Sequence, residues 1–311
     1  MRQLPHPAWT RNLIEAGRLE AGERVLVVVD EPLLEQGSQL LAAARDAGAH
    51  AHLELWNGLA PVEEGIRTDL LFFLAQEPKG HEAQERFALA ESVAQNEGRE
   101  LFLGFVDKAL LEGELSQPSP DLSRVAQALL DELDGADLIR IRGRAGTDLT
   151  VRAGGRPWHT DAKPLEAGEM ANYPSGEVYV SPLEDSADGV LVADLTVPYT
   201  VPGLVDAPVT LRFEAGRVTS IEGGRAAQLL RELVADSGTG ADVIAELGIG
   251  FNPALAPRGH VMLDEKAART AHVAIGRNTG SYGGVNEAAI HVDCVFSEPE
   301  VEVDGRKVEL P

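Results

Sequence analysis

The first half of the chain alternates short, nearly continuous apolar runs with amphipathic segments, and this pattern constrains the fold more than any other feature. Arg24–Val29 reads RVLVVV and Leu70–Ala75 reads LLFFLA. Strands of this kind are covered on both faces, which is typical of parallel sheets. Apolar residues at helical spacing follow the first run and end near Gly48. The alternation predicts a Rossmann-like α/β domain with a parallel sheet over residues 1–135.

A sheet of this kind often binds a nucleotide, but the sequence argues against that ligand here. The chain leaves the first predicted strand through Asp30–Leu33, which reads DEPL and contains no glycine-rich turn. A pyrophosphate needs such a turn for close backbone approach, and two acidic residues would repel it. No GxxxxGK[ST] motif occurs either. We therefore expect no nucleotide site in this half.

Residues 136–311 show a different pattern, with many short strands and few helices. Ile139–Arg142 and Leu149–Ala153 alternate apolar and polar residues, and Gly143–Gly146 suits the turn of a hairpin. One amphipathic helix is expected over Arg225–Val234, and Asp304-Gly305 indicates a hairpin near the end of the chain. The second half is therefore predicted to be a β-rich α+β domain.

Composition excludes several classes of partner. The 311 residues carry a formal net charge of −23, which disfavours a nucleic-acid backbone or an anionic membrane surface as a partner. A single cysteine permits no intrachain disulfide. No apolar run approaches the ~18–20 residues of a membrane span, and the N-terminal residues lack the pattern of a signal peptide. We expect a cytoplasmic protein that binds neither nucleic acid nor membrane.

The segment Gly283–Phe296, which reads GGVNEAAIHVDCVF, contains the most informative polar residues. Its second half is a predicted strand, on which His291 and Asp293 share one face while Val292 and Cys294 point to the other. Burying a histidine and an aspartate among apolar residues is costly unless both have partners. A metal ion satisfies both groups, and so does a purely structural hydrogen-bonded pair. The strand alone leaves these two interpretations open.

Three further segments place one polar residue among apolar or small neighbours. They are NYPSGEVYVSP with Glu177, IAELGIGFNP with Glu246, and AHVAIGRN with His272. Each has an ordinary explanation by itself, because a lone glutamate is usually solvated and a lone buried histidine usually finds a hydrogen bond. Together with His291 and Asp293 they give three carboxylates and two imidazoles. This set is close to what two divalent ions need when they share a bridging carboxylate and a water.

These four motifs, in this order, resemble those of the thermophilic metallo-aminopeptidase family of the aminopeptidase T type. GTDL at Gly146–Leu149 is also similar to a segment that precedes the active-site domain in that family, and the likeness spans about residues 140–305. The resemblance implies a cytoplasmic hydrolase, usually a homodimer, with two zinc or cobalt ions. It would remove N-terminal residues from a peptide substrate by means of a metal-activated water.

The resemblance also assigns roles by position. It places the metal ligands at Glu177, Glu246, His272, His291 and Asp293. Either Glu177 or Glu246 would act as the general base. The family has a tyrosine shortly after its first histidine, whereas Asn278 or Thr279 occupies that place here and Tyr282 lies further on.

Two alternative functions stay open at this point. The 2,5-dihydroxypyridine dioxygenases resemble the same family and hold one Fe(II), for which His272, His291 and Asp293 would form a two-histidine, one-carboxylate triad. The retained pair of glutamates favours two hydrolytic metal ions over one iron. The third interpretation is a metal-binding protein without catalytic activity.

Overall fold

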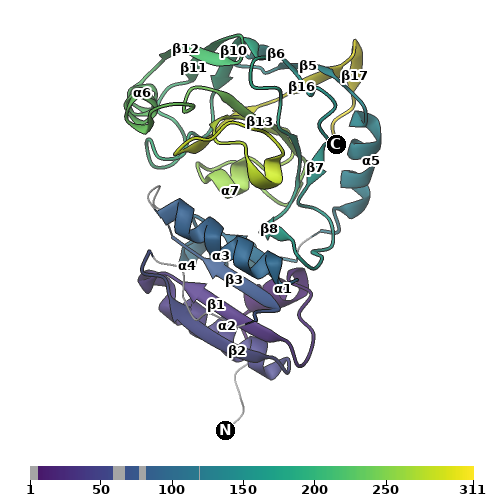
Figure 1. Ribbon diagram of the computed structural model, residues 1–311, viewed down its shortest axis with the longest axis vertical. Coiled ribbons are helices and arrows are strands. Elements are labelled where there is room, and N and C mark those ends of the chain that lie inside the picture. The colour runs from purple at the N-terminus through teal and green to yellow at the C-terminus, as the bar shows by residue number, and fades with distance from the viewer. Residues whose placement is uncertain (1–5, 59–66, 77–81, 119) are drawn as a thin grey trace. The chain divides into compact units, whose positions relative to one another are not determined.

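The computed structural model describes residues 6–58, 67–76, 82–118 and 120–311. The chain divides into two compact units (Figure 1). Unit 1 comprises residues 1–120 and 164–175, and unit 2 comprises residues 121–163 and 176–311. A parallel sheet in unit 1 and antiparallel sheets in unit 2 agree with the predicted change of pattern along the chain.

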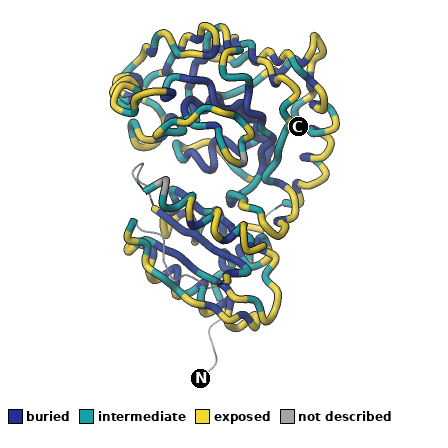
Figure 2. Tube along the Cα trace, viewed as in Figure 1, coloured by how far each residue is buried: buried dark blue, intermediate teal, exposed yellow. Residues whose placement is uncertain are grey.

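Unit 1 contains a five-stranded sheet of order β2-β1-β3-β4-β8 in which every neighbouring pair is parallel. Its strands are β1 (Arg24–Val29), β2 (His50–Leu55), β3 (Leu70–Leu74), β4 (Arg99–Leu103) and β8 (Met170–Asn172). Its helices are α1 (Ala8–Ala16), η1 (Glu31–Leu33), α2 (Leu34–Asp46), α3 (Ala83–Gln95), α4 (Lys108–Glu112) and η3 (Glu114–Ser116). All five residues of β3 are buried, as the run LLFFL predicts for a central strand (Figure 2).

The units differ from the predicted domains 1–135 and 136–311 in two respects. Helix α5 (Ser123–Leu133) belongs to unit 2, because Ala126, Leu129 and Leu133 pack in the core of that unit. The chain also returns to unit 1 to add β8 beside β4. A strand of three residues has too little pattern to be recognised in the sequence, so this return could not be predicted.

Unit 2 contains two sheets. The seven-stranded sheet has the order β12-β11-β10-β6-β5-β16-β17, and the five-stranded sheet has the order β15-β14-β13-β9-β7. The first is formed by β5 (Leu138–Arg142), β6 (Asp148–Arg152), β10 (Asp188–Ala193), β11 (Val209–Glu214), β12 (Arg217–Glu222), β16 (Glu300–Val303) and β17 (Arg306–Val308). The second is formed by β7 (His159–Thr160), β9 (Glu177–Val180), β13 (Ile244–Gly250), β14 (Thr270–Gly276) and β15 (His291–Ser297). The remaining helices are α6 (Arg225–Ser237), α7 (Val261–Asp264) and η4 (Gly280–Tyr282).

The two faces of the five-stranded sheet differ sharply in composition. Leu247, Val273 and Val292 point to one face and pack in a core shared with residues of the seven-stranded sheet such as Ile141 and Leu211. Side chains alternate along a strand, so the residues between them point to the opposite face. That opposite face carries the polar residues singled out in the sequence, next to glycine and alanine.

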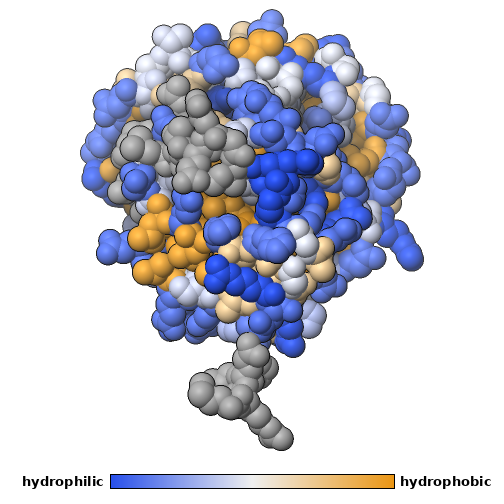
Figure 3. Space-filling model, turned by 60° about the horizontal axis from the view of Figure 1, so that its bottom comes forward, coloured by the Kyte–Doolittle hydropathy of each residue, from blue (hydrophilic) through white to orange (hydrophobic). Residues whose placement is uncertain are grey.

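No helix among the described residues combines the length and the apolar composition that crossing a bilayer requires. The space-filling view in Figure 3 shows hydrophilic side chains over much of the visible surface, in keeping with the net charge of −23.

Candidate metal centre

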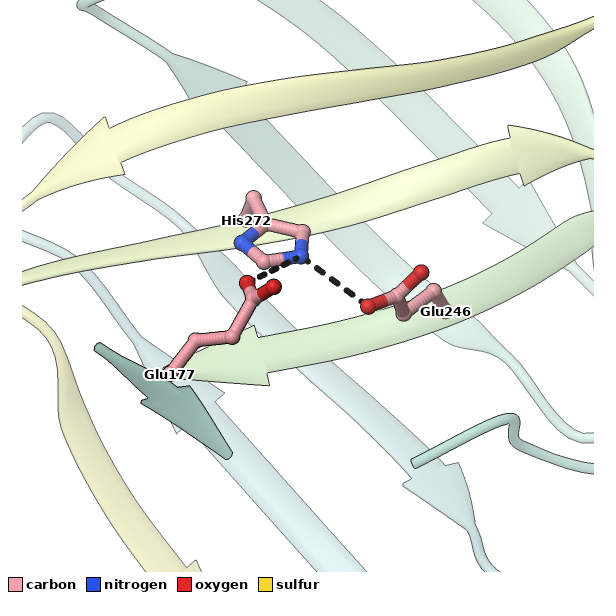
Figure 4. Close-up of side chains that lie close together, drawn as sticks. All are labelled: Glu177, Glu246 and His272. Carbon is pink, nitrogen blue, oxygen red and sulfur yellow. Dashed lines mark hydrogen bonds and ion pairs between the residues drawn. The ribbon is translucent and has the colours of Figure 1, made fainter. Parts of the chain in front are cut away.

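Three buried side chains from three neighbouring strands point toward one another (Figure 4). Nε2 of His272 on β14 lies 3.3 Å from Oε1 of Glu246 on β13 and 3.7 Å from Oε2 of Glu177 at the start of β9. The side chains of all three residues are at most 6% exposed. These three side chains each offer a ligand atom close enough to the others to share one metal ion.

A second group forms on the adjacent strand β15. Nε2 of His291 lies 3.2 Å from Oδ1 of Asp293 and 3.3 Å from Oε2 of Glu246. The other ring nitrogen, Nδ1, lies 2.7 Å from the carbonyl oxygen of Arg277, to which it donates as N–H. That bond leaves Nε2 as the nitrogen available for a metal ion. The structure therefore brings together all five residues that the sequence singled out.

The local sequence of β13 explains how a glutamate and an imidazole fit on this face. The register between β13 and β14 shifts between Ile244 and Glu246, and such a bulge re-aims the side chain that follows it. Gly248 then lies opposite His272, and a Cβ atom at Gly248 would lie 2.1 Å from the imidazole Cε1. The histidine ring occupies the space that any larger residue at 248 would fill. Gly248 of IAELGIG is thus part of the construction of the site.

Opposite charges within the cluster stabilise one another. Burial alone would raise the pKa of Glu246, but hydrogen bonds from His272 and His291 bring that pKa below its ordinary value. Burial would likewise lower the pKa of His272, but the hydrogen bond to Glu246 and the charge of Glu177 raise it to about 10. Burial would raise the pKa of Asp293, whereas the charge of His291 lowers it to about 2. Glu246 and Asp293 are therefore ionised, whereas burial raises the pKa of Glu177 to about 7 against the opposing charge of Lys266. The pocket favours positive charge, which a metal ion can supply in place of the imidazole protons.

Two buried atoms of the cluster have no hydrogen-bond partner within the described part of the chain. They are Oε2 of Glu177 and Nδ1 of His272. Buried polar atoms are rarely left unpaired, and Oε2 of Glu177, which lies 3.7 Å from Nε2 of His272 inside the site, therefore indicates a ligand there. Nitrogen and carboxylate oxygen donors are suitable for zinc and similar divalent ions. The residues present therefore fit a metal site.

Sequence reasoning missed a buried lysine beside this cluster. Nζ of Lys266, in the turn after α7, lies 2.7 Å from Oε1 of Glu177, 2.6 Å from Oε1 of Glu265 and 3.5 Å from Oδ2 of Asp161. Burial would lower the pKa of Lys266, but the charges of these carboxylates raise it well above its ordinary value, so the side chain is an ammonium ion. Adjacent charges in LDEKAA read as a solvated surface turn, and no local signal distinguishes them from one.

A tyrosine also lies beside the cluster. The ring of Tyr282 stacks on His291 with ring centroids 4.8 Å apart and an interplanar angle of 23°. The place of the family's tyrosine is taken here by Asn278 or Thr279, and Asn278 is buried and donates from Nδ2 to Oε1 of Glu184 at 2.9 Å. The residue at 278 thus anchors a loop, while Tyr282 supplies an aromatic ring at the site from a different position.

A sequence model of the thermophilic metalloprotease (M29) family matches residues 120–309. This range covers nearly all of unit 2 together with residues 164–175 of unit 1. The chain belongs to this family. Membership confirms the family resemblance derived from the motifs.

Individual relatives within and near this family have different activities. Aminopeptidase T of Thermus aquaticus is 32% identical over 181 residues, and aminopeptidase AmpS of Bacillus subtilis is 28% identical over 182 residues. Each match covers 51% of this chain but only 43% of the relative, so the match spans less than half the length of these aminopeptidases. A 2,5-dihydroxypyridine 5,6-dioxygenase of Pseudomonas putida is 28% identical over 207 residues, which cover 62% of this chain and 58% of that protein.

Two solved structures share the fold over nearly the whole chain. The 2,5-dihydroxypyridine dioxygenase of Pseudomonas putida KT2440 matches with a TM-score of 0.76 and 20% identity, covering 99% of this chain and 97% of that chain. AmpT of Thermus thermophilus matches with a TM-score of 0.66 and 19% identity, covering 96% of this chain and 97% of that chain. At these identities the likeness shows the mixed α/β fold alone.

Proposed function

We propose that this protein is a metal-dependent aminopeptidase that removes N-terminal residues from peptides. The observation that carries the proposal is the arrangement of Glu246 between two potential ligand groups. Its Oε1 lies 3.3 Å from Nε2 of His272, and its Oε2 lies 3.3 Å from Nε2 of His291. A carboxylate with one oxygen toward each imidazole suits a ligand that bridges two ions.

The ligand assignment follows from the two groups. Glu177, Glu246 and His272 would hold one ion, while Glu246, His291 and Asp293 would hold the other. Divalent ions at such a site lower the pKa of a water molecule and polarise a carbonyl group, which is the chemistry that peptide hydrolysis needs. Zinc or cobalt is the expected metal on the basis of the family resemblance.

The side chains themselves bind the substrate and move its protons. The side chains of His291 and Asp293 are each 18% exposed, whereas those of Glu177, Glu246 and His272 are almost fully covered. A peptide therefore approaches from the side of β15, where the Asp293 carboxylate is available to attract its free amine. Glu177 or Glu246 would take the proton of the attacking water as general base, through an oxygen that is not bound to an ion at that step.

The runner-up function is a ring-cleaving dioxygenase with a single Fe(II). One observation favours it: His272, His291 and Asp293 also converge, with Nε2 of His272 4.0 Å and Nε2 of His291 3.2 Å from the same Asp293 oxygen. Such a facial triad is typical of non-haem iron oxygenases. Glu177 and Glu246 would not bind metal under that interpretation, and the buried Glu246 carboxylate would be paired only with the imidazoles of His272 and His291.

Metal analysis with substrate assays separates these functions. We expect about two zinc or cobalt ions per chain, cleavage of an unblocked aminoacyl-anilide, and no cleavage of its N-acetylated form. One iron per chain, with oxygen consumed in the presence of a dihydroxypyridine and no action on peptides, would replace the proposal by the dioxygenase. Two ions with no turnover of either substrate would identify a metal-binding protein. The cytoplasmic location and the homodimer stay predictions.

A further inference from the structure

The Lys266 ammonium is a buried cation in direct contact with a proposed metal ligand. Its side chain is fully buried, and Nζ lies 2.7 Å from Oε1 of Glu177. Its other two neighbours are Glu265 at 2.6 Å and Asp161 at 3.5 Å, neither of which belongs to the two groups that can hold a metal ion. Lys266 therefore connects the proposed metal ligand Glu177 to two carboxyl groups, Glu265 and Asp161, that are not proposed ligands.

Contacts with Asp161 and Lys266 fix both the backbone and the side-chain carboxylate of Glu177. Oδ1 of Asp161 accepts hydrogen bonds from the backbone N–H groups of Gly176 at 2.8 Å and Glu177 at 3.0 Å, which fixes the start of β9. Lys266 donates to Oε1 of the Glu177 side chain. Oε2 has no hydrogen-bond partner among the residues that the structure describes and lies 3.7 Å from Nε2 of His272. One oxygen is thus occupied by the lysine, and the other faces the metal site.

The charges of the cluster give an independent reason for a lysine at this place. Five carboxyl groups gather around the site: Asp161, Glu177, Glu246, Glu265 and Asp293. The Lys266 ammonium contacts three of them, Glu177, Glu265 and Asp161, and offsets negative charge that a buried site tolerates poorly.

We propose that Lys266 is a positioning residue that makes Glu177 a ligand through Oε2 alone. Without the ammonium, both oxygens of Glu177 are free to chelate one ion, and the added oxygen occupies a coordination position that water or substrate needs. This inference rests on the proposed metal site. It adds a residue that no motif in the sequence indicated.

A purely structural role predicts a different outcome. Buried ion pairs often stabilise a fold without any effect on chemistry, and removal of one partner then lowers stability and occupancy together. Positioning predicts that the metal stays while its coordination changes. Lys266→Met removes the charge and keeps most of the side-chain volume. Lys307→Met, at an exposed position on β17, is the matched control.

The experiment measures metal content, the visible spectrum of the cobalt-loaded protein, and kinetics for the parent and both variants. For Lys266→Met we expect unchanged metal stoichiometry, weaker visible cobalt absorption because the coordination number rises, and a kcat lower by about 10- to 100-fold with little change in KM. Lys307→Met should match the parent. An unchanged spectrum and kcat, or loss of metal in proportion to loss of folded protein, would overturn the proposal.

A second measurement needs no variant and decides the matter if Lys266→Met fails to fold. In a crystal structure of the zinc-loaded parent, we expect Glu177 to bind zinc through one oxygen while Lys266 still contacts the other. Two-oxygen chelation by Glu177, or a lysine turned away from it, would contradict the inference. Failure of the proposed function is a separate result, because it appears as absent peptide hydrolysis by the parent whatever the contact between Lys266 and Glu177.

Discussion

Each unit of the molecule buries a glutamate within a strand, and the two glutamates have opposite properties. Glu100 on β4 of unit 1 is 2% exposed, and within the described residues its Oε2 has no hydrogen-bond partner. Burial raises the pKa of Glu100 to about 8, although the charge of Arg86 opposes this effect. Glu246 on β13 of unit 2 is 4% exposed, yet hydrogen bonds from two imidazoles lower its pKa.

The difference shows what makes a buried carboxylate useful for chemistry. Burial by itself keeps the acid protonated, because a lone charge in an apolar environment is costly. Only partners of opposite charge keep the group ionised. Unit 1 provides a covered sheet in which an acid is neutral, whereas unit 2 provides histidines at hydrogen-bonding distance. The same residue type is therefore inert in one unit and a candidate metal ligand in the other.

The comparison is tested most strongly by removal of the charge of Glu246. Glu246→Gln should lower the metal content from about two ions toward one and abolish hydrolysis of an unblocked dipeptide, because the bridging oxygen charge is lost. Metal analysis and a dipeptide assay measure both effects. Glu222→Gln, at an exposed position on β12, serves as the matched control. Full metal content together with parent activity in Glu246→Gln would show that this carboxylate is not a metal ligand.

Removal of the two less buried side chains of the site, His291 and Asp293, should have a similarly large effect. His291→Ala and Asp293→Ala should each abolish activity and reduce bound metal while the fold survives, because these side chains face away from the apolar core. Circular dichroism checks the fold, and metal analysis checks the occupancy. If both variants keep their full metal content, the assignment of these residues as ligands is wrong.

The neutral acid of unit 1 makes stability depend on pH. The Glu100 pKa is about 8 in the folded chain against 4.5 for the unperturbed group, so the unfolded chain releases the proton first as pH rises. Stability contributed by this residue is therefore lost progressively between pH 4.5 and pH 8. Glu100→Gln should resemble the parent at pH 4 and exceed its free energy of unfolding at pH 9 by up to about 5 kcal/mol. Urea titrations at both pH values measure the difference, and an equal difference at both would contradict the assignment.

The smallest effect is expected at Cys294. Its side chain is fully buried on the apolar face of β15, between two residues of the polar face. Cys294→Ala should keep metal content and activity and cost about 1 kcal/mol of stability from lost packing. Thermal unfolding measures that cost. Loss of metal in this variant would mean that the thiol, and not only its neighbours, faces the site.

The sequence predicted the strands better than the contacts between them. The continuous apolar run RVLVVV identified β1 with correct ends, and strand alternation placed His291 and Asp293 opposite Cys294. It failed for Lys266 and Asp161, because their importance comes from contacts with Glu177 at the start of β9, which lies 89 and 16 residues away from them in the sequence. A charged residue in a turn looks solvated until the fold brings other charges around it. The local sequence pattern therefore identifies the face of a strand on which a side chain lies. It does not identify the residues from other segments that contact and position that side chain.

The path of the chain between the two units limits how this protein can be divided. The polypeptide passes from one unit to the other three times, after residues 120, 163 and 175. A gene fragment that ends at residue 120 lacks β8, so the outer edge of β4 loses its partner strand. A fragment that starts at residue 121 carries residues 164–175 without the strand they pair with. Expression of the metal-binding unit by itself therefore requires an internal deletion closed by a designed linker, and a single truncation at either end is not sufficient.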